Sequence, residues 1–357
     1  MKIYIKYLIS NFIKLTLIVS SIFFLLVLLL NLFEEINFFK DKSDNLYYPI
    51  LLNFLNAPTI LNKVFPFIFL ISTQFFFIKL FNNDEINIFK YSGLKNFKII
   101  SVLSLLSFFL GLIIITVFYT FSSNLQNYYL KIKNQYTNDQ SYLAVINKNG
   151  LWIKDIVDNK ISIINSGLIE DNFLKETIIT TFDEDYNPIS NIKSNKIDIK
   201  NNIWLIYNAS VFEGDKNIIY DQYKFKTNFN LEMIRSLFSN LSSLSILELF
   251  ELRNDYKKLN YSIVDVNMQI NKVLSYPLFL SLMTILSSII MLGTKKLKSN
   301  TLKIIIGLFC SVIIYYLVNF FNVMGSTEKI NLLIAIWSPL FILGLINSSM
   351  LIKINEK

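Results

Sequence analysis

The sequence contains no histidine and only one cysteine, Cys310, among its 357 residues. These absences exclude an internal disulfide framework, the usual zinc sites, haem ligation by histidine, and any catalytic dyad or triad that needs an imidazole. The phosphate-binding pattern G-x-x-x-x-G-K-S/T does not occur either, so we expect no ATP hydrolysis by this chain itself. We also expect no metal site and no cofactor.

Charged residues are scarce, at 17% of the chain, whereas hydrophobic residues make up 53%. This composition is typical of a membrane protein. A bilayer core about 30 Å thick needs about 20 apolar residues in a helix. Runs of that kind lie at 8–33, 60–81, 99–121, 273–293, 302–324 and 330–352. The sequence therefore predicts an α-helical membrane protein with six transmembrane helices.

The positive charge of the chain is concentrated in short loops. Lys and Arg number 34 against 26 Asp and Glu, and the lysines gather at both chain ends and after the second and fourth apolar runs. The loop after the fifth run offers only Glu328 and Lys329. Because basic residues in short loops stay in the cytoplasm, we expect both termini there and the long region 122–270 outside it.

The region 122–270 reads as an inserted all-β domain. Short segments rich in Ile, Tyr and Phe alternate with Gly, Asn and Asp, which is typical of strands and turns. The predicted strands are 142–146, 151–153, 160–164, 177–182, 196–199, 203–212 and 218–226, with an amphipathic helix at 245–256. The pattern fits a sandwich, a jelly roll or an open barrel. The expected domains are 1–121 with the first three spans, 122–270, and 271–357 with the last three.

The loop between the second and third runs carries a short helical pattern near 83–95. Ile86, Phe89 and Lys90 follow at helical spacing, with acidic residues at the start and Gly93 placed as a stop. By the charge argument this helix faces the cytoplasm. On the local pattern alone, an ordinary capped surface helix remains open.

Prolines and a glutamate–glycine pair mark these segments. Pro66 lies in the second run, and Gly93 follows Glu85 by eight positions in the next loop. Pro58 precedes the second run and Pro277 lies in the fourth. Together with the order of three spans, a β domain and three spans, these residues resemble the LptF/LptG family of permeases in the bacterial lipopolysaccharide export system. The segment Gly150-Leu151-Trp152, followed by Lys154-Asp155, is similar to the LptG branch.

The resemblance implies a permease subunit of an ATP-binding-cassette exporter, which extracts lipopolysaccharide from the bacterial inner membrane and passes it to a periplasmic bridge. The implied partners are a cytoplasmic ATPase dimer, a second related six-span permease, and a bridge protein with a similar β domain. The β domain itself would be a jelly-roll-like periplasmic domain. No nucleic-acid partner is expected.

The resemblance also assigns site residues. The ATPase-coupling segment would comprise Asp84, Glu85, Ile86, Phe89 and Gly93. Within it, Glu85 would meet a basic residue of the ATPase, while Ile86 and Phe89 would insert into a groove on its surface.

Charges near the outer end of the first span would contact the phosphorylated lipid head group. The expected residues are Glu34, Glu35, Lys40, Lys42 and Lys63. The chain departs from the LptG branch at Thr59, where a basic residue is common, and Lys63 is a possible substitute. Ordinary interfacial charges that cap a span would look the same in sequence.

Two other functions compete with export. A six-span membrane sensor or enzyme could act through its periplasmic β domain, although a sensor usually carries a large cytoplasmic output domain. A secondary transporter would show charged residues inside the spans, and these are nearly absent here.

Overall fold

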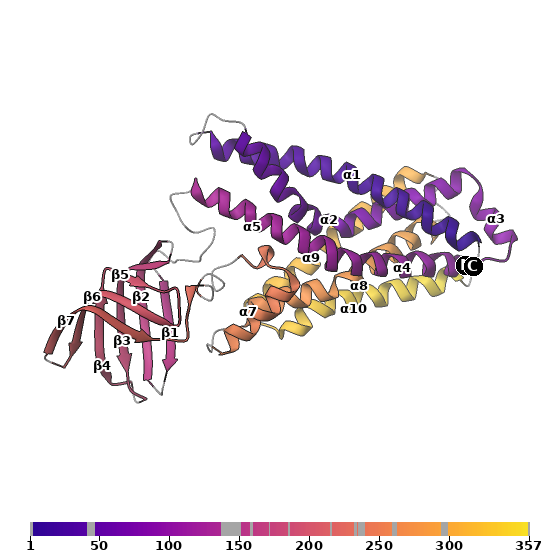
Figure 1. The fold of residues 1–357 in the computed structure, drawn as a ribbon. Coiled ribbons are helices and arrows are strands. Elements are labelled where there is room, and N and C mark those ends of the chain that lie inside the picture. Colours follow the sequence, from indigo (N-terminus) through magenta and orange to yellow (C-terminus); the bar gives the residue numbers. More distant parts are fainter. Residues whose placement is uncertain are drawn as a thin grey trace. The chain divides into compact units, whose positions relative to one another are not determined.

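The computed structural model describes residues 3–355 except 41–46, 137–150, 158–159, 171, 185, 215, 232–233, 235–239, 259–262 and 294–298. The chain divides into two compact units (Figure 1). A helical unit comprises Met1–Tyr129, Ser242–Leu249 and Val264–Lys357, and a β unit comprises Leu130–Leu241 and Phe250–Ile263. Each unit is described by itself.

The helical unit confirms the predicted six spans. In the described part of the chain, six helical segments are long and apolar enough to cross a membrane. They are α1 (Ile3–Phe39), α2 (Tyr47–Asn82), α4 (Asn96–Ile113) continuing through a π-helical turn (Ile114–Phe118) into α5 (Tyr119–Gln135), α8 (Val264–Gly293), α9 (Asn300–Ser326) and α10 (Leu332–Asn355). The shorter helices are α3 (Glu85–Tyr91) and α7 (Ile246–Lys258).

Helix α2 begins earlier than the sequence predicts. Pro58, expected before the second span, lies inside the helix together with Pro66. The added turns contain two asparagines, and the buried one bonds to α1: Asn53 donates to the carbonyl of Leu28 at 2.9 Å, and Asn31 donates to the side chain of Asn53 at 2.9 Å. A buried amide is tolerated when it finds such partners, which is why the helix continues through these asparagines.

Helices α4 and α8 pack closely through small residues. Ser104 and Ser281 share a hydrogen bond of 2.7 Å, and Ser107 and Thr284 share one of 2.8 Å. A Cβ on Gly111 would lie 2.7 Å from the Cα of Pro277. Small side chains and hydroxyl pairs hold helices together in a membrane, where burial of apolar surface gives little driving force.

The β unit contains one antiparallel sheet of seven described strands: β1 (Leu151–Val157), β2 (Lys160–Glu170), β3 (Phe173–Phe182), β4 (Pro188–Ser194), β5 (Lys196–Asp198), β6 (Ile203–Glu213) and β7 (Lys216–Lys226). Both β4 and β5 pair with β3 on one side and β6 on the other, so they act as one broken strand in a simple meander. The inserted all-β domain is thereby confirmed. Its jelly-roll form is not, since the described strands form a single sheet.

Two strand predictions need comment. Strand β4 was not predicted, and the strand predicted at 142–146 lies outside the described residues.

A buried carboxylate links β1 to the segment that follows β7. Asp155 of β1 is 2% exposed and accepts hydrogen bonds from the Thr227 hydroxyl at 2.5 Å and the Asn228 amide side chain at 2.8 Å. These bonds fix the end of β7 to β1.

A line of three extra residues, Glu176, Asn195 and Asn208, crosses the sheet from β3 to β6, and we call this line the crease. At Glu176, Asn195 and Asn208 one extra exposed residue enters each neighbouring strand, and the backbone of Glu176 and of Asn208 has positive φ, at 51° and 47°. The pairing register is the same on both sides of the crease. The alternation of buried residues therefore switches phase in all three strands together. The buried sets on the two sides are Leu174 and Thr177, Ile179; Ile192, Ser194 and Ile197, Ile199; and Trp204, Ile206 and Ala209, Val211.

Candidate functional site

Helix α3 lies at the end of the helical unit where α1 begins and α10 ends (Figure 1). Ile86 of α3 and Leu8 of α1 belong to the same buried cluster, and Leu351 of α10 packs against it. Helix α3 follows α2 and precedes α4 in the chain, and it shares this cluster with helices from both ends of the sequence.

The two ends of α3 explain its short length. Asp84 has a left-handed backbone with φ 58°, and its carboxylate accepts a hydrogen bond from the Asn87 side chain at 2.6 Å. Gly93 has φ 79° just past the last turn, and its N–H donates to the carbonyl of Lys90 at 2.9 Å. A left-handed glycine is the common stop of a helix, because a side chain there would be strained.

The inner face of α3 is fixed to α1. Tyr7 donates a hydrogen bond of 2.8 Å to Oε1 of Glu85, which also accepts one of 2.9 Å from Asn83. The rings of Tyr7 and Phe89 meet edge to face, with centroids 6.5 Å apart. Ile86 is 4% exposed. Its side chain packs into the core of this chain, and its insertion into a groove of the ATPase stays a prediction.

The outer face of α3 carries different residues from those predicted. Ile88 is 58% exposed and Tyr91 is 90% exposed. Lys90 beside them is also exposed. The sequence pattern selected Ile86 and Phe89 because the apolar positions of a short helix do not show which side faces the core.

The charges at the end of α1 occupy contrasting environments. Glu34 and Lys40 are exposed, whereas Glu35 has no exposed surface and accepts a hydrogen bond of 2.8 Å from the Tyr129 hydroxyl. Lys42 lies outside the described residues. The structure thus buries one member of the predicted acidic pair and exposes the other.

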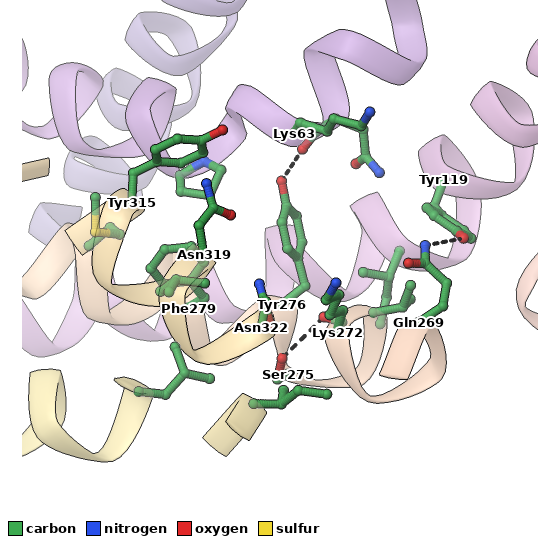
Figure 2. A pocket seen from close by; sticks show the side chains of 18 of the residues that line it. Lys63, Tyr119, Gln269, Lys272, Ser275, Tyr276, Phe279, Tyr315, Asn319 and Asn322 are labelled. Carbon is green, nitrogen blue, oxygen red and sulfur yellow. Dashed lines mark hydrogen bonds between the residues drawn. The ribbon is translucent and has the colours of Figure 1, made fainter. Parts of the chain in front are cut away.

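Lys63 lines a separate cavity of about 390 Å³ inside the helical unit. Glu34, Glu35 and Lys40 are not among its described lining residues. Figure 2 shows Lys63 of α2, Lys272 of α8, and Asn319 and Asn322 of α9 around this space. Among the described members of the predicted head-group set, Lys63 alone thus lines this cavity.

Several polar groups of the cavity wall are hydrogen-bonded to one another. The Tyr276 hydroxyl donates to the carbonyl of Asn62, and Gln269 donates to the Tyr119 hydroxyl at 3.2 Å (Figure 2). Asn62 Oδ1 is buried without a partner among the described residues. No acidic side chain belongs to the described lining, so the two lysines give the cavity a positive charge.

Such a cavity can hold an anionic head group. Ammonium groups and amide N–H donors bind phosphate oxygens, and apolar walls accept part of an acyl chain. Sequence analysis missed Lys272 because it precedes the apolar run expected at 273–293, although α8 begins at Val264 and carries it into the bundle. In the described part of the chain, no group of His, Cys, Asp and Glu side chains could hold a metal ion.

The described residues form six spans and an inserted sheet, and the sequence can be set beside known proteins with this arrangement in view. No curated protein matches the sequence significantly. The sequence model of the family described as "Lipopolysaccharide export system permease LptF/LptG" matches residues 6–353. Members of this family are permease subunits and not ATPases. Since the match covers nearly the whole chain, this multi-pass membrane protein belongs to the LptF/LptG family of lipopolysaccharide export permeases.

Proposed function

We propose that the chain is one permease of an ATP-binding-cassette exporter that extracts lipopolysaccharide from the bacterial inner membrane. The observation that carries the proposal is the family match over residues 6–353, which includes every span and the whole described sheet. A second related permease completes the pair. The opening Leu151-Trp152 of β1 supports the LptG-like member.

The ATPase docks on α3 from the cytoplasm. The lysine-rich loops support this orientation, with both termini on the same side. The exposed Ile88 and Tyr91 make the contact, while Glu85, Ile86 and Phe89 attach the coupling helix to the permease. Asp84 and Gly93 fix its two ends. ATP hydrolysis on the partner then moves a helix that this chain holds by its inner face.

The lipid head group contacts the cationic cavity through Lys63 and Lys272. Glu34 and Lys40 lie near the end of α1, where exposed charges attract or sort phosphorylated sugars, and Lys42 follows them in the sequence. Glu35 serves the same site by holding α1 to Tyr129.

The β unit passes lipid to a bridge protein with a similar domain. Strand β7 pairs only with β6 among the described strands and carries exposed Ile218, Ile219 and Tyr220. An edge strand of this kind can accept a further strand from a partner. We therefore assign the periplasmic joint to β7.

Purification of the tagged chain from its native membrane in a mild detergent tests the proposal. Mass spectrometry of the eluate should find a cytoplasmic ATPase, a second six-span permease and a phosphorylated glycolipid. An intact chain recovered without any of them would contradict the export function and favour a stand-alone sensor or enzyme.

A further inference from the structure

The contact between α1 and α3 contains one hydrogen bond that joins helices far apart in the chain. The Tyr7 hydroxyl lies 2.8 Å from Oε1 of Glu85, and the two residues are separated by 78 positions. The other bond to this oxygen comes from Asn83, which is local to α3. Oε2 of Glu85 is buried without a partner among the described residues. Among the described hydrogen bonds, the one from Tyr7 therefore links the Glu85 carboxylate to α1.

Helix α1 lies at the periphery of the helical unit and packs mainly on α2. Only 17% of the most apolar stretch of α1 is buried, against 72% for α8. A helix of 37 residues is about 55 Å long and behaves as a stiff rod. A pull at one end of a peripheral rod displaces its whole length more easily than it would displace α8, most of which is buried.

The far end of this rod carries the polar groups near the expected lipid path. Asn31 and Glu35 of α1 are buried against Asn53 and Tyr129. Between the two ends, α1 exposes Leu17, Leu25 and Leu29. A displacement of α1 would therefore move apolar surface and these polar contacts together.

We propose that Tyr7 is a positioning residue which transmits movement of α3 to α1 through its hydrogen bond with Glu85. This inference rests on the proposed function, since it assumes that a partner ATPase moves α3. The hydroxyl is not needed to fill the core, because Tyr7 is 39% exposed. Its ring contact with Phe89 would persist without the hydroxyl.

The test compares Tyr7→Phe with Tyr4→Phe in the complete exporter reconstituted in proteoliposomes. Tyr4 packs against the same buried cluster one turn earlier, and no hydrogen bond of its hydroxyl is found among the described residues. Both variants lose one hydroxyl from α1. Measurements are ATPase co-purification, ATP hydrolysis, and lipid released per ATP hydrolysed.

For Tyr7→Phe we expect normal co-purification and continued hydrolysis, with roughly tenfold less lipid released per ATP, as loss of a hydrogen bond to a charged group implies. Tyr4→Phe should match the wild type. Glu85→Gln keeps an oxygen acceptor and should retain more coupling than Glu85→Ala.

Unchanged lipid release by Tyr7→Phe would overturn the inference. Loss of the ATPase from Tyr7→Phe would overturn it as well, because the hydroxyl would then serve docking and not transmission. Failure of the proposed function is recognised separately, since the wild-type chain would then bring no ATPase or release no lipid.

Discussion

Single side chains give the cavity its charge. Because Lys63 and Lys272 are not offset by an acid in the described lining, reversal of both charges should repel an anionic head group. We expect Lys63→Glu/Lys272→Glu to reduce the phosphorylated glycolipid that co-purifies with the chain by more than roughly tenfold, since tenfold is the effect of losing a single charge-assisted contact. Quantitative lipid mass spectrometry measures the change.

The matched control for this pair is Lys200→Glu/Lys329→Glu, which changes the net charge by the same amount. Lys200 and Lys329 are exposed and are not part of the described lining. The control changes the charge of the chain without changing the cavity. Equal lipid loss in the control would show that total charge, and not the cavity, governs lipid recovery.

Individual residue environments were the hardest feature to predict. The sequence indicated that Glu34 and Glu35 share an interface, but a single helical step separates an exposed carboxylate from a buried one. Two residues along α3, buried Ile86 gives way to exposed Ile88. Which side of a helix faces the core depends on neighbours that the local pattern does not contain.

At the scale of elements, the contact between α4 and α8 depends on Gly111. A Cβ there would meet the Pro277 backbone at 2.7 Å, and a proline backbone cannot move aside as a side chain can. Gly111→Ala should push the helices apart and lower the free energy of unfolding by about 1–3 kcal/mol. Thermal unfolding of the purified chain in detergent measures this.

Gly344→Ala is the matched control in α10. The atom nearest to a Cβ added at Gly344 would be Cδ2 of Leu282, at 3.9 Å, which is an ordinary van der Waals contact. Alanine also favours a helix over glycine by about 1 kcal/mol. The control should therefore be at least as stable as the wild type, and a comparable loss in both variants would argue against the steric explanation.

Long elements were predictable, whereas their full lengths were not. The six apolar runs located every span, but Asn53 and Pro58 interrupt the first turns of α2 in the sequence, and the bond of Asn53 to α1 keeps these turns in the helix. Strand β4 escaped prediction because Pro188 and Asn191 interrupt its alternation, although pairing with β3 and β6 holds it in the sheet.

For the whole molecule, sequence order predicted more than any single motif. Three spans, an inserted sheet and three spans were readable from composition, and the family match over 6–353 agrees with that order. The predicted jelly-roll form is not confirmed, and strand pairing could not be read from the sequence because it depends on contacts between distant segments.

The crease in the sheet gives a prediction for the integrity of the β unit. Deletion of Asn195 would shift Ile197 and Ile199 to the opposite face while β3 and β6 keep their phase. The sheet should lose protease resistance and unfold at a lower temperature. Deletion of Glu184, in the turn between β3 and β4, is the control and should be tolerated far better.

The crease also restricts how this sheet can change over evolutionary time. One strand cannot gain or lose its extra residue alone, because Glu176, Asn195 and Asn208 keep three neighbouring strands in phase. An insertion or deletion there would survive only if matching changes arose in the adjoining strands. Length variation among descendants of this chain should therefore accumulate in the turns, while the distances from each turn to the crease stay constant.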